Sequence, residues 1–383
     1  MRGPAVKPIV IAAGGTGGHF FPAEALAHVL VARGQRVALM TDARSGALRS
    51  EVFAGGEIFV LRGAGIAGRG VLRAAGATAA LAVGTLQARS ILARLDPAVI
   101  VGFGGYPTIS PVSATRFLRR RPPVVLHEQN AVLGRANRAM AAHAGVLALS
   151  FEATARVPAG VRTVVVGNPV RPGFAPSPTP AMEGTIHVLV LGGSLGARVF
   201  SDAVPDALAG LPDAVRTRLS VVQQCRAEDL ARVGQAYAAS SIAAELSAFF
   251  PDVAQRLAAA HLVIARAGAS TVAELAMVGR AAVLVPLPGA IDDHQAANAA
   301  ALGGACVIPQ SDIATLGAHL ATILTRPEAL AHTGLDAAAT AKPDAASCLA
   351  DLVLAEAARG SEPKHSSAHL APARATAPEG RSS

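Results

Sequence analysis

The stretch Ile9-Val10-Ile11-Ala12-Ala13-Gly14-Gly15-Thr16-Gly17-Gly18-His19 decides the fold. It begins as an apolar, β-branched run, passes through four glycines and leads into a helical pattern from Phe20 to about Arg33. A strand, a glycine turn and a helix in this order point free backbone N–H groups and a helix dipole at an anion. Glycine also lets the backbone approach a phosphate or a sugar more closely than any residue with a Cβ. The stretch therefore predicts a binding site for a negatively charged ligand.

This glycine turn departs from two well-known phosphate motifs. A P-loop would continue with Gly-Lys-Ser/Thr, where this chain has His19-Phe20-Phe21. The dinucleotide fingerprint G-x-G-x-x-G lacks its third glycine here, although Asp42 closes the next strand roughly where a ribose-binding acid would lie. A glycine turn that only joins a strand to a helix remains the alternative without a binding function.

The composition is that of an α/β protein with two domains. The chain has 383 residues, 51% hydrophobic and 3% aromatic, so each half is long enough for its own core. Its three cysteines are odd in number and lack metal-ligand spacing, which indicates a reducing compartment without a disulfide framework or a metal site. The first residues lead straight into a predicted strand, and no apolar run is long enough to span a bilayer. We therefore expect neither a signal peptide nor a membrane span.

Charge is distributed unevenly along the chain, whose formal net charge is +8. Residues 1–170 carry 19 Lys and Arg against 7 Asp and Glu, a net +12, whereas residues 171–356 carry 11 against 17, a net −6. A basic half predicts an anionic partner, such as a membrane surface or a polyanionic substrate. Nucleic acid is disfavoured as a partner because the chain has no aromatic stacking platform and no known binding motif.

Strand and helix patterns alternate through the first 170 residues. The predicted strands are 7–12, 36–40, 97–103, 123–127, 145–149 and 162–166. This alternation is typical of a parallel sheet covered by helices on both faces, with ligands at the carboxyl ends of the strands. Glycine-rich or polar runs follow three of these strands: Gly104-Gly105-Tyr106-Pro107, His127-Glu128-Gln129-Asn130 and Gly167-Asn168-Pro169-Val170-Arg171.

A second series of the same kind follows a proline-rich segment. Residues 171–180 contain four prolines, which predicts a semi-rigid linker over 171–185. Strands are then predicted at 186–191, 219–224, 261–265 and 281–285, with helices from 197 and at 252–260, 271–279 and 294–302, and a helical region at 311–357. The first of these strands again ends in glycines, Gly192-Gly193-Ser194-Leu195-Gly196. We therefore expect two similar open α/β halves with a cleft between them, and a disordered tail over 358–383.

The strand at 261–265 leads into a second candidate anion site. Arg266-Ala267-Gly268-Ala269-Ser270-Thr271 opens a helix that carries Glu274. Such a helix N-terminus offers N–H groups to a diphosphate, and Glu274, one turn further on, is placed to accept hydrogen bonds from ribose hydroxyls. The alternative is an N-cap at Ser270 or Thr271, with Glu274 completing a capping box.

The next helix carries two amides on one face. Gln295 and Asn298 lie three residues apart, where their side chains can hydrogen-bond sugar hydroxyls. Asp292 and Asp293 precede them beside a proline-rich loop without further ligands. We interpret these two aspartates as residues that start the helix, and not as metal ligands.

Taken in order, the glycine and polar motifs resemble one family, the peptidoglycan N-acetylglucosaminyltransferases. These enzymes add the second sugar to the lipid-linked muramyl-pentapeptide precursor. The resemblance runs from about Lys7 to about Leu354 and rests on six motifs, which begin at Gly14, Gly104, His127, Gly167, Gly192 and Asp293. It implies an α/β GT-B fold with a Rossmann-like, acceptor- and membrane-facing domain over 1–170. It also implies a second Rossmann-like, UDP-sugar-binding domain over 186–357, whose last helix can pack back on the first domain.

The resemblance also implies which residues bind the substrates. In the second half, and at the start of the linker, it implies contacts to UDP-N-acetylglucosamine from Arg171, Ser194, Phe250 (through its backbone), Ala269, Ser270, Glu274 and Gln295. In the first half it implies contacts to donor or acceptor from Thr16, Gly17, Gly18 and Asn130. Two departures stand out. The chain has Gln224-Cys225-Arg226 where the family usually has a small hydroxyl residue and glycine, and Ala267 where serine is common.

Transfer of a sugar from UDP needs a way to stabilise the leaving diphosphate and a base for the acceptor hydroxyl. We expect no metal or cofactor, so that backbone N–H groups and Arg171 meet the negative charge. A positioned base contributes typically 10²–10⁴-fold to such a step. His19 is the first choice for this base and Glu128 the second, while His19 as a ligand of the acceptor phosphate is the alternative. A direct single displacement would invert the anomeric carbon.

The basic first half fits an acceptor that is anchored in an anionic leaflet. The apolar and arginine-rich stretch from Ile66 to Arg94 resembles a membrane-docking patch, and juxtamembrane Lys and Arg contribute about 1 kcal/mol each near such a surface. An ordinary amphipathic core helix with a basic solvent face is the alternative. We expect UDP-N-acetylglucosamine and undecaprenyl-linked muramyl-pentapeptide as substrates, and peripheral binding to the cytoplasmic face of the bacterial inner membrane. Another GT-B transferase, a UDP-sugar epimerase or a non-catalytic sugar-nucleotide-binding regulator are the competing hypotheses for function.

Overall fold

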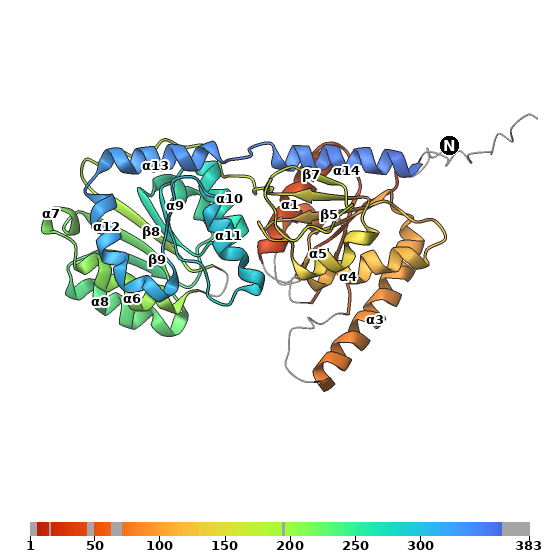
Figure 1. The fold of residues 1–383 in the computed structure, drawn as a ribbon, viewed down its shortest axis with the longest axis horizontal. Coiled ribbons are helices and arrows are strands. Elements are labelled where there is room, and N and C mark those ends of the chain that lie inside the picture. Colours follow the sequence, from red (N-terminus) through yellow and green to blue (C-terminus); the bar gives the residue numbers. More distant parts are fainter. Residues whose placement is uncertain (1–5, 15–16, 44–49, 63–70, 194–195, 362–383) are drawn as a thin grey trace, which may run out of the picture.

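The computed structural model describes residues 6–14, 17–43, 50–62, 71–193 and 196–361. It contains two α/β units, each built on one parallel sheet (Figure 1). Thr16 and Ser194, two of the predicted binding residues, lie outside the described residues, as does the stretch from Ile66 to Gly70. The pattern-based prediction of two parallel-sheet halves is confirmed.

The first sheet has seven strands in the order β3-β2-β1-β4-β5-β6-β7, all parallel. Its strands are β1 (Ile9–Ala12), β2 (Val37–Thr41), β3 (Glu57–Val60), β4 (Val99–Gly102), β5 (Val124–Glu128), β6 (Val146–Leu149) and β7 (Thr163–Val165). Its helices are α1 (Gly17–Ala32), α2 (Glu51–Ala54), α3 (Val71–Leu95), α4 (Gly105–Ala114) and α5 (Arg135–Met140). Strand order changes direction between β1 and β4, where ligands of open α/β sheets bind.

The second sheet has six parallel strands in the order β10-β9-β8-β11-β12-β13. Its strands are β8 (Ile186–Leu191), β9 (Leu219–Gln224), β10 (Ala243–Ser247), β11 (Leu262–Ala265), β12 (Ala282–Leu284) and β13 (Cys306–Val307). Its helices are α6 (Arg198–Ala209), α7 (Asp213–Arg216), α8 (Leu230–Ala239), α9 (Val253–Ala259), α10 (Ala269–Val278), α11 (His294–Ala300), α12 (Leu316–Leu324) and α13 (Pro327–Ala339). The switch between β8 and β11 matches the switch in the first sheet.

Apolar strands buried on both faces account for this architecture. Every residue of β1, β4, β6 and β11 is buried, which is what a parallel sheet covered by helices on both sides requires. Apolar cores lie on the two faces of each sheet, and α1 contributes Leu26, Ala27 and Leu30 to one of them. The continuous apolar runs were therefore sufficient to predict the central strands.

The chain crosses between the two units twice. Residues 166–185 contain no strand or helix and lead from β7 to β8. The last helix, α14 (Ala345–Ser361), returns to the first unit, where Leu349, Ala350 and Val353 are fully buried in the core beside α1 (Figure 1). The two crossings touch, because a Cβ on Gly167 (φ +89°) would lie 2.6 Å from Cβ of Lys342.

Candidate active site

His19 lies where two glycine-bearing segments of the first sheet meet. It stands in the first turn of α1, which begins at Gly17 and so includes two of the glycines that we predicted to lie in the turn. Gly105 (φ +66°) follows β4, and a Cβ there would lie 3.4 Å from Cδ2 and 3.5 Å from Nε2 of the His19 ring. The Nδ1 edge of the ring lies 3.1 Å from Oε1 of Gln129. The imidazole therefore lies between the carboxyl ends of β1, β4 and β5, half-buried, as a ligand-binding residue of this fold should.

Glu128, the second choice for the base, is occupied by hydrogen bonds within the protein. Oε1 accepts from the backbone and the side chain of Asn130, both at 3.0 Å. Oε2 accepts from N of Gly134 and Nδ2 of Asn137, both at 2.9 Å. The residue is 2% exposed. To take a proton from a substrate, Glu128 would first have to give up one of four donors, so the geometry favours His19.

Asn298 joins the two units through hydrogen bonds, which corrects its predicted role as a sugar ligand. Its Oδ1 accepts from N of Ala131 at 2.8 Å. Its Nδ2 donates to Oδ1 of Asn130 at 3.0 Å and to O of Ala267 at 3.1 Å. The side chain is fully buried, and these bonds leave no amide hydrogen for a ligand. The sequence pattern showed an amide on a helix face but not that its partners lie in the other unit.

Arg171 and Glu274 also meet across the boundary between the units. Nη2 of Arg171 donates to Oε1 of Glu274 at 3.3 Å, and the guanidinium lies 3.8 Å above the ring of Phe21 on α1. Burial raises the pKa of Glu274 to about 7, against the opposing charge and hydrogen bond of Arg171. The arginine that we expect to meet a diphosphate is thus held beside the start of α10 by contacts to both units.

The N-terminus of α10 carries no side-chain cap. The capping position belongs to Gly268, and Glu274 pairs with Arg171, so the capping box considered above does not form. Oγ of Ser270 is buried and has no hydrogen-bond partner among the described residues. Free N–H groups and a free hydroxyl at a ten-residue helix favour an anionic ligand at this end.

Comparison with known proteins identifies the chemistry that this arrangement serves. The glycosyltransferase family 28 N-terminal domain matches residues 9–146, and the C-terminal domain of the same family matches residues 187–349. A protein of Granulibacter bethesdensis named UDP-N-acetylglucosamine–N-acetylmuramyl-(pentapeptide) pyrophosphoryl-undecaprenol N-acetylglucosamine transferase is 58% identical, covering 92% of this chain and 94% of its own. A protein of the same name from Acidiphilium cryptum is 52% identical, covering 92% and 98%. The chain belongs to this transferase family.

Solved structures agree with the assignment. MurG of Acinetobacter baumannii superposes with a TM-score of 0.73 at 30% identity, over 91% of this transferase and 99% of that chain. UDP-GlcNAc 2-epimerase from Neisseria meningitidis, solved with UDP-GlcNAc, superposes with a TM-score of 0.63 at 9% identity, over 91% and 100%. The second likeness shows the fold alone. The transferase is an N-acetylglucosamine transferase with the GT-B fold, and the resemblance found in its motifs is confirmed.

Three other residues that the sequence suggested for ligand binding contact other residues of the transferase. Phe250 is buried, with the guanidinium of Arg256 4.2 Å above its ring. Oε1 of Gln295 accepts from N of Leu287 at 2.9 Å. Asp42, which favoured a dinucleotide, is buried and accepts a hydrogen bond from the hydroxyl of Tyr106. The roles of Phe250 and Gln295 toward a nucleotide stay predictions.

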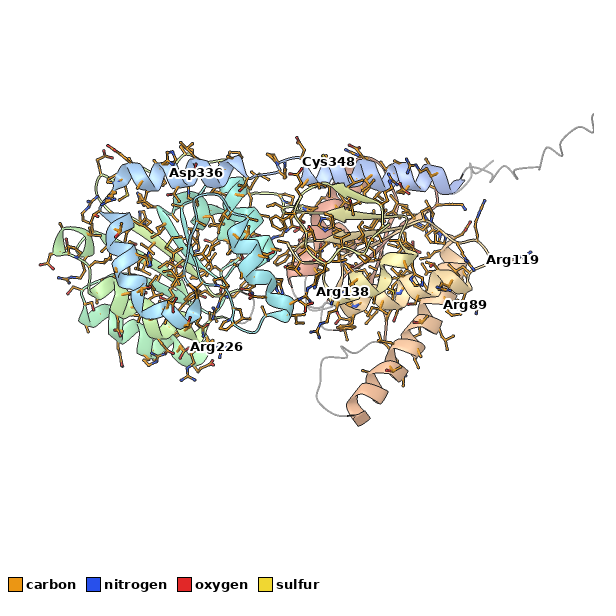
Figure 2. All side chains as sticks on the ribbon, in the orientation of Figure 1. Arg89, Arg119, Arg138, Arg226, Asp336 and Cys348 are labelled. Atoms are coloured by element: carbon orange, nitrogen blue, oxygen red, sulfur yellow. The ribbon has the colours of Figure 1, made fainter. Side chains whose placement is uncertain are left out.

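Two features of the transferase were not found from sequence. Asp292, which we had interpreted only as a helix-start residue, faces Arg156 at 2.5 Å, Arg138 at 3.2 Å and Arg135 at 3.9 Å, all from the first unit. Figure 2 shows Arg138 where the two units meet. Burial acts to raise the pKa of Asp292, but Arg156 and Arg138 outweigh it and hold the pKa below its usual range. The second feature is the contact of Gln129 with His19. The only sequence signal for Gln129 was its place in the polar run His127-Glu128-Gln129-Asn130.

Two structural findings concern metals and membranes. Among the described residues, no three His, Cys, Asp or Glu side chains are grouped as metal ligands would be. Within the same part of the chain, every helix is too short or too polar to cross a bilayer.

Proposed function

We propose that the transferase moves N-acetylglucosamine from UDP-N-acetylglucosamine to undecaprenyl-pyrophosphoryl-N-acetylmuramyl-pentapeptide, with inversion at the anomeric carbon. The observation that carries the proposal is that Arg171 joins α1, the helix of His19, to α10, whose start is uncapped: it lies over Phe21 of α1 and pairs with Glu274 of α10. This arrangement occurs in a chain 58% identical to a transferase named for that reaction.

The second unit binds the donor in this proposal. The diphosphate lies at the start of α10, against the N–H groups and side chain of Ala269 and Ser270, with Ser194 in the glycine turn after β8. Arg171 supplies the positive charge, and Glu274 binds the ribose hydroxyls. Since Arg171 and Glu274 already pair, the same donor molecule can contact both side chains. Phe250 (through its backbone) and Gln295 complete the proposed donor contacts.

The first unit binds the acceptor and supplies the base. Thr16, Gly17, Gly18 and Asn130 contact substrate at the carboxyl edge of the first sheet. Nε2 of His19 takes the proton of the acceptor hydroxyl while that oxygen forms its bond to the anomeric carbon. The bond from that carbon to the diphosphate oxygen breaks, and UDP leaves with the electron pair. The negative charge on UDP is met by amide N–H groups and Arg171, so the proposal includes no metal or cofactor.

The first unit also docks on the cytoplasmic face of the bacterial inner membrane in this proposal. Its sequence is strongly basic, at +12 over residues 1–170, from 19 Lys and Arg against 7 Asp and Glu. The N-terminal part of α3 extends away from the rest of the unit (Figure 1), whereas its C-terminal part packs on the core through Ala88 and Leu92. The helix exposes 66% of Leu86 beside the exposed Arg89. Arg89 donates to O of Phe117, which is 62% exposed. Apolar side chains among arginines match an anionic lipid surface.

Transfer is tested with labelled UDP-N-acetylglucosamine and the lipid-linked muramyl-pentapeptide. We expect the rate of transfer to fall by about 10²-fold or more in His19→Ala. The rate should not change in His332→Ala, a control at an exposed site. Release of an epimerised sugar from the donor alone would support an epimerase instead. Full transfer by His19→Ala would show that His19 is not the base.

Membrane docking has its own test. We expect co-sedimentation with vesicles that contain anionic lipid, weakened by salt and by Leu86→Ser, and no binding to vesicles of neutral lipid. Binding that is indifferent to lipid charge and to salt would contradict the proposed docking.

A further inference from the structure

His19 is the first member of a chain of three hydrogen-bonding side chains. Nδ1 of His19 lies 3.1 Å from Oε1 of Gln129. Nε2 of Gln129 lies 2.9 Å from O of Phe103 and 3.3 Å from Nδ1 of His127. Nε2 of His127 lies 3.0 Å from O of Gly167. Gln129 and His127 are buried, so water does not compete for the contacts that Gln129 makes with Phe103 and His127, or for the contact of His127 with Gly167.

The end of this chain away from His19 is the backbone carbonyl of Gly167, and a second carbonyl, that of Phe103, contacts Gln129 in the middle. These two acceptors fix the direction of every bond. The carbonyl of Gly167 can only accept, so Nε2 of His127 carries a hydrogen. Burial lowers the pKa of His127 to about 4, which leaves the ring neutral near pH 7, and Nδ1 is then an acceptor.

The orientation of the Gln129 amide follows. The carbonyl of Phe103 and Nδ1 of His127 are both acceptors, and they face the same side of the amide. That side must be the –NH₂ group, whose two hydrogens match the two acceptors. The amide oxygen is therefore turned toward His19, where it can only accept.

We propose that Gln129 is a positioning residue that holds His19 in the Nδ1–H tautomer and leaves the lone pair on Nε2 for the acceptor hydroxyl. In water a histidine side chain prefers the opposite tautomer, with the hydrogen on Nε2, which cannot act as a base at that atom. The amide of Gln129 selects against that form because its oxygen would then face a second lone pair. The catalytic part of this inference rests on the proposed function, whereas the tautomer does not.

The orientation of the base also depends on the crossing between the two units. Gly167 begins the segment that leads to the second unit, and its carbonyl fixes the tautomer of His127, which in turn fixes the amide of Gln129. Gly105 completes the arrangement on the other side, since a side chain there would lie against the Nε2 edge of His19.

The tautomer is measured by ¹⁵N NMR of the full-length transferase with labelled histidine, without substrate. We expect His19, assigned by loss of its signals in His19→Gln, to show a protonated Nδ1 and an unprotonated Nε2 at alkaline pH, where imidazole side chains are neutral. A protonated Nε2, or an even mixture of the two forms, would overturn the proposal. This result is independent of whether the enzyme transfers any sugar.

The positioning role is tested with Gln129→Met, which has a similar volume but no amide, against Gln35→Met on the surface as the matched control. We expect Gln129→Met to lower kcat about tenfold, to leave KM for the sugar donor unchanged and to give a mixed His19 tautomer. Gln35→Met should match the wild type in all three. An unchanged kcat together with a mixed tautomer would refute the role in catalysis. A lowered kcat with the tautomer intact would show that Gln129 acts in another way.

Discussion

Replacing Asn298 by alanine should loosen the connection between the two units. The change removes three hydrogen bonds, to N of Ala131, Oδ1 of Asn130 and O of Ala267. The first two partners belong to the first unit and the third to the loop before α10. At about 1 kcal/mol for each bond, and more for a buried group left without a partner, we expect a loss of about 3 kcal/mol in the free energy of unfolding.

Asn168→Ala is the matched control for this substitution. Asn168 is also buried near the crossing between the units, but its amide oxygen and nitrogen have no hydrogen-bond partner among the described residues. Truncation there breaks no bond and should change the free energy of unfolding by less than about 1 kcal/mol. Both variants replace a buried asparagine by alanine, so a difference in stability between them reports the hydrogen bonds of Asn298.

Asn298→Asp tests whether the amide group of Asn298 is needed as a hydrogen-bond donor. Aspartate keeps the acceptor for Ala131 but turns an oxygen toward Oδ1 of Asn130 and O of Ala267. Asn130 cannot turn to relieve this contact, because its Nδ2 donates to Glu128. We therefore expect Asn298→Asp to be at least as unstable as the alanine variant, although it has nearly the same shape.

The assay is urea unfolding followed by circular dichroism, with sugar transfer measured on the same samples. We expect the Asn298 variants to unfold at a lower urea concentration than the wild type and to lose kcat/KM. Equal stability of Asn298→Ala and Asn168→Ala would refute the reasoning, since the bonds would then contribute nothing to holding the units together.

Three further predictions concern the same boundary. Glu274, with a pKa raised to about 7 from 4.5, keeps its proton longer in the folded state. Its contribution to stability is therefore complete below about pH 4.5 and lost as pH rises to about 7, and Glu274→Gln should flatten that slope in urea unfolding. Asp292→Asn should lower the free energy of unfolding in low salt and lower it less in 1 M salt, since its arginine partners are partly exposed to solvent. Gly167→Ala, at φ +89° against Lys342, should lose about 1–3 kcal/mol, and more than Gly184→Ala, where φ is +83° and nothing lies within 4 Å.

Sequence patterns predicted the central strands and one edge strand, β7, but missed the other three edge strands. The runs that form β1, β4, β6 and β11 are apolar throughout because both faces of those strands are covered. Three edge strands were not predicted. Strand β10 is mostly exposed, β13 has two residues, and β3 alternates between half-buried and exposed positions. At a sheet edge one side of the strand meets solvent, so the hydrophobic signal on which the prediction depends is weak.

The site was predicted in its residue types but not in its contacts. The polar run at the end of β5 marked Glu128 and Asn130 for chemistry, and the structure shows that both bind protein groups. Asn298 was predicted to bind a sugar because an amide on a helix face is suited to that. Its partner Asn130 lies 168 residues away along the chain, and no local pattern reports such a contact.

Neutral amides, rather than ion pairs, hold the base and connect it to the other unit. Gln129 fixes His19, while Asn130 and Asn298 link the next residues of the same loop to the segment that opens α10. An amide offers donor and acceptor together, so a sequence of amides that ends on backbone carbonyls has only one satisfied orientation. A carboxylate in the place of Gln129 or Asn298 would face acceptors and add negative charge beside the proposed diphosphate sites. The one carboxylate in this segment, Glu128 at the end of β5, has its oxygens covered by four N–H donors. The segment from His127 to Ala131, at the end of β5, therefore orients the base on one side and positions the start of α10 on the other, without repelling an anionic substrate.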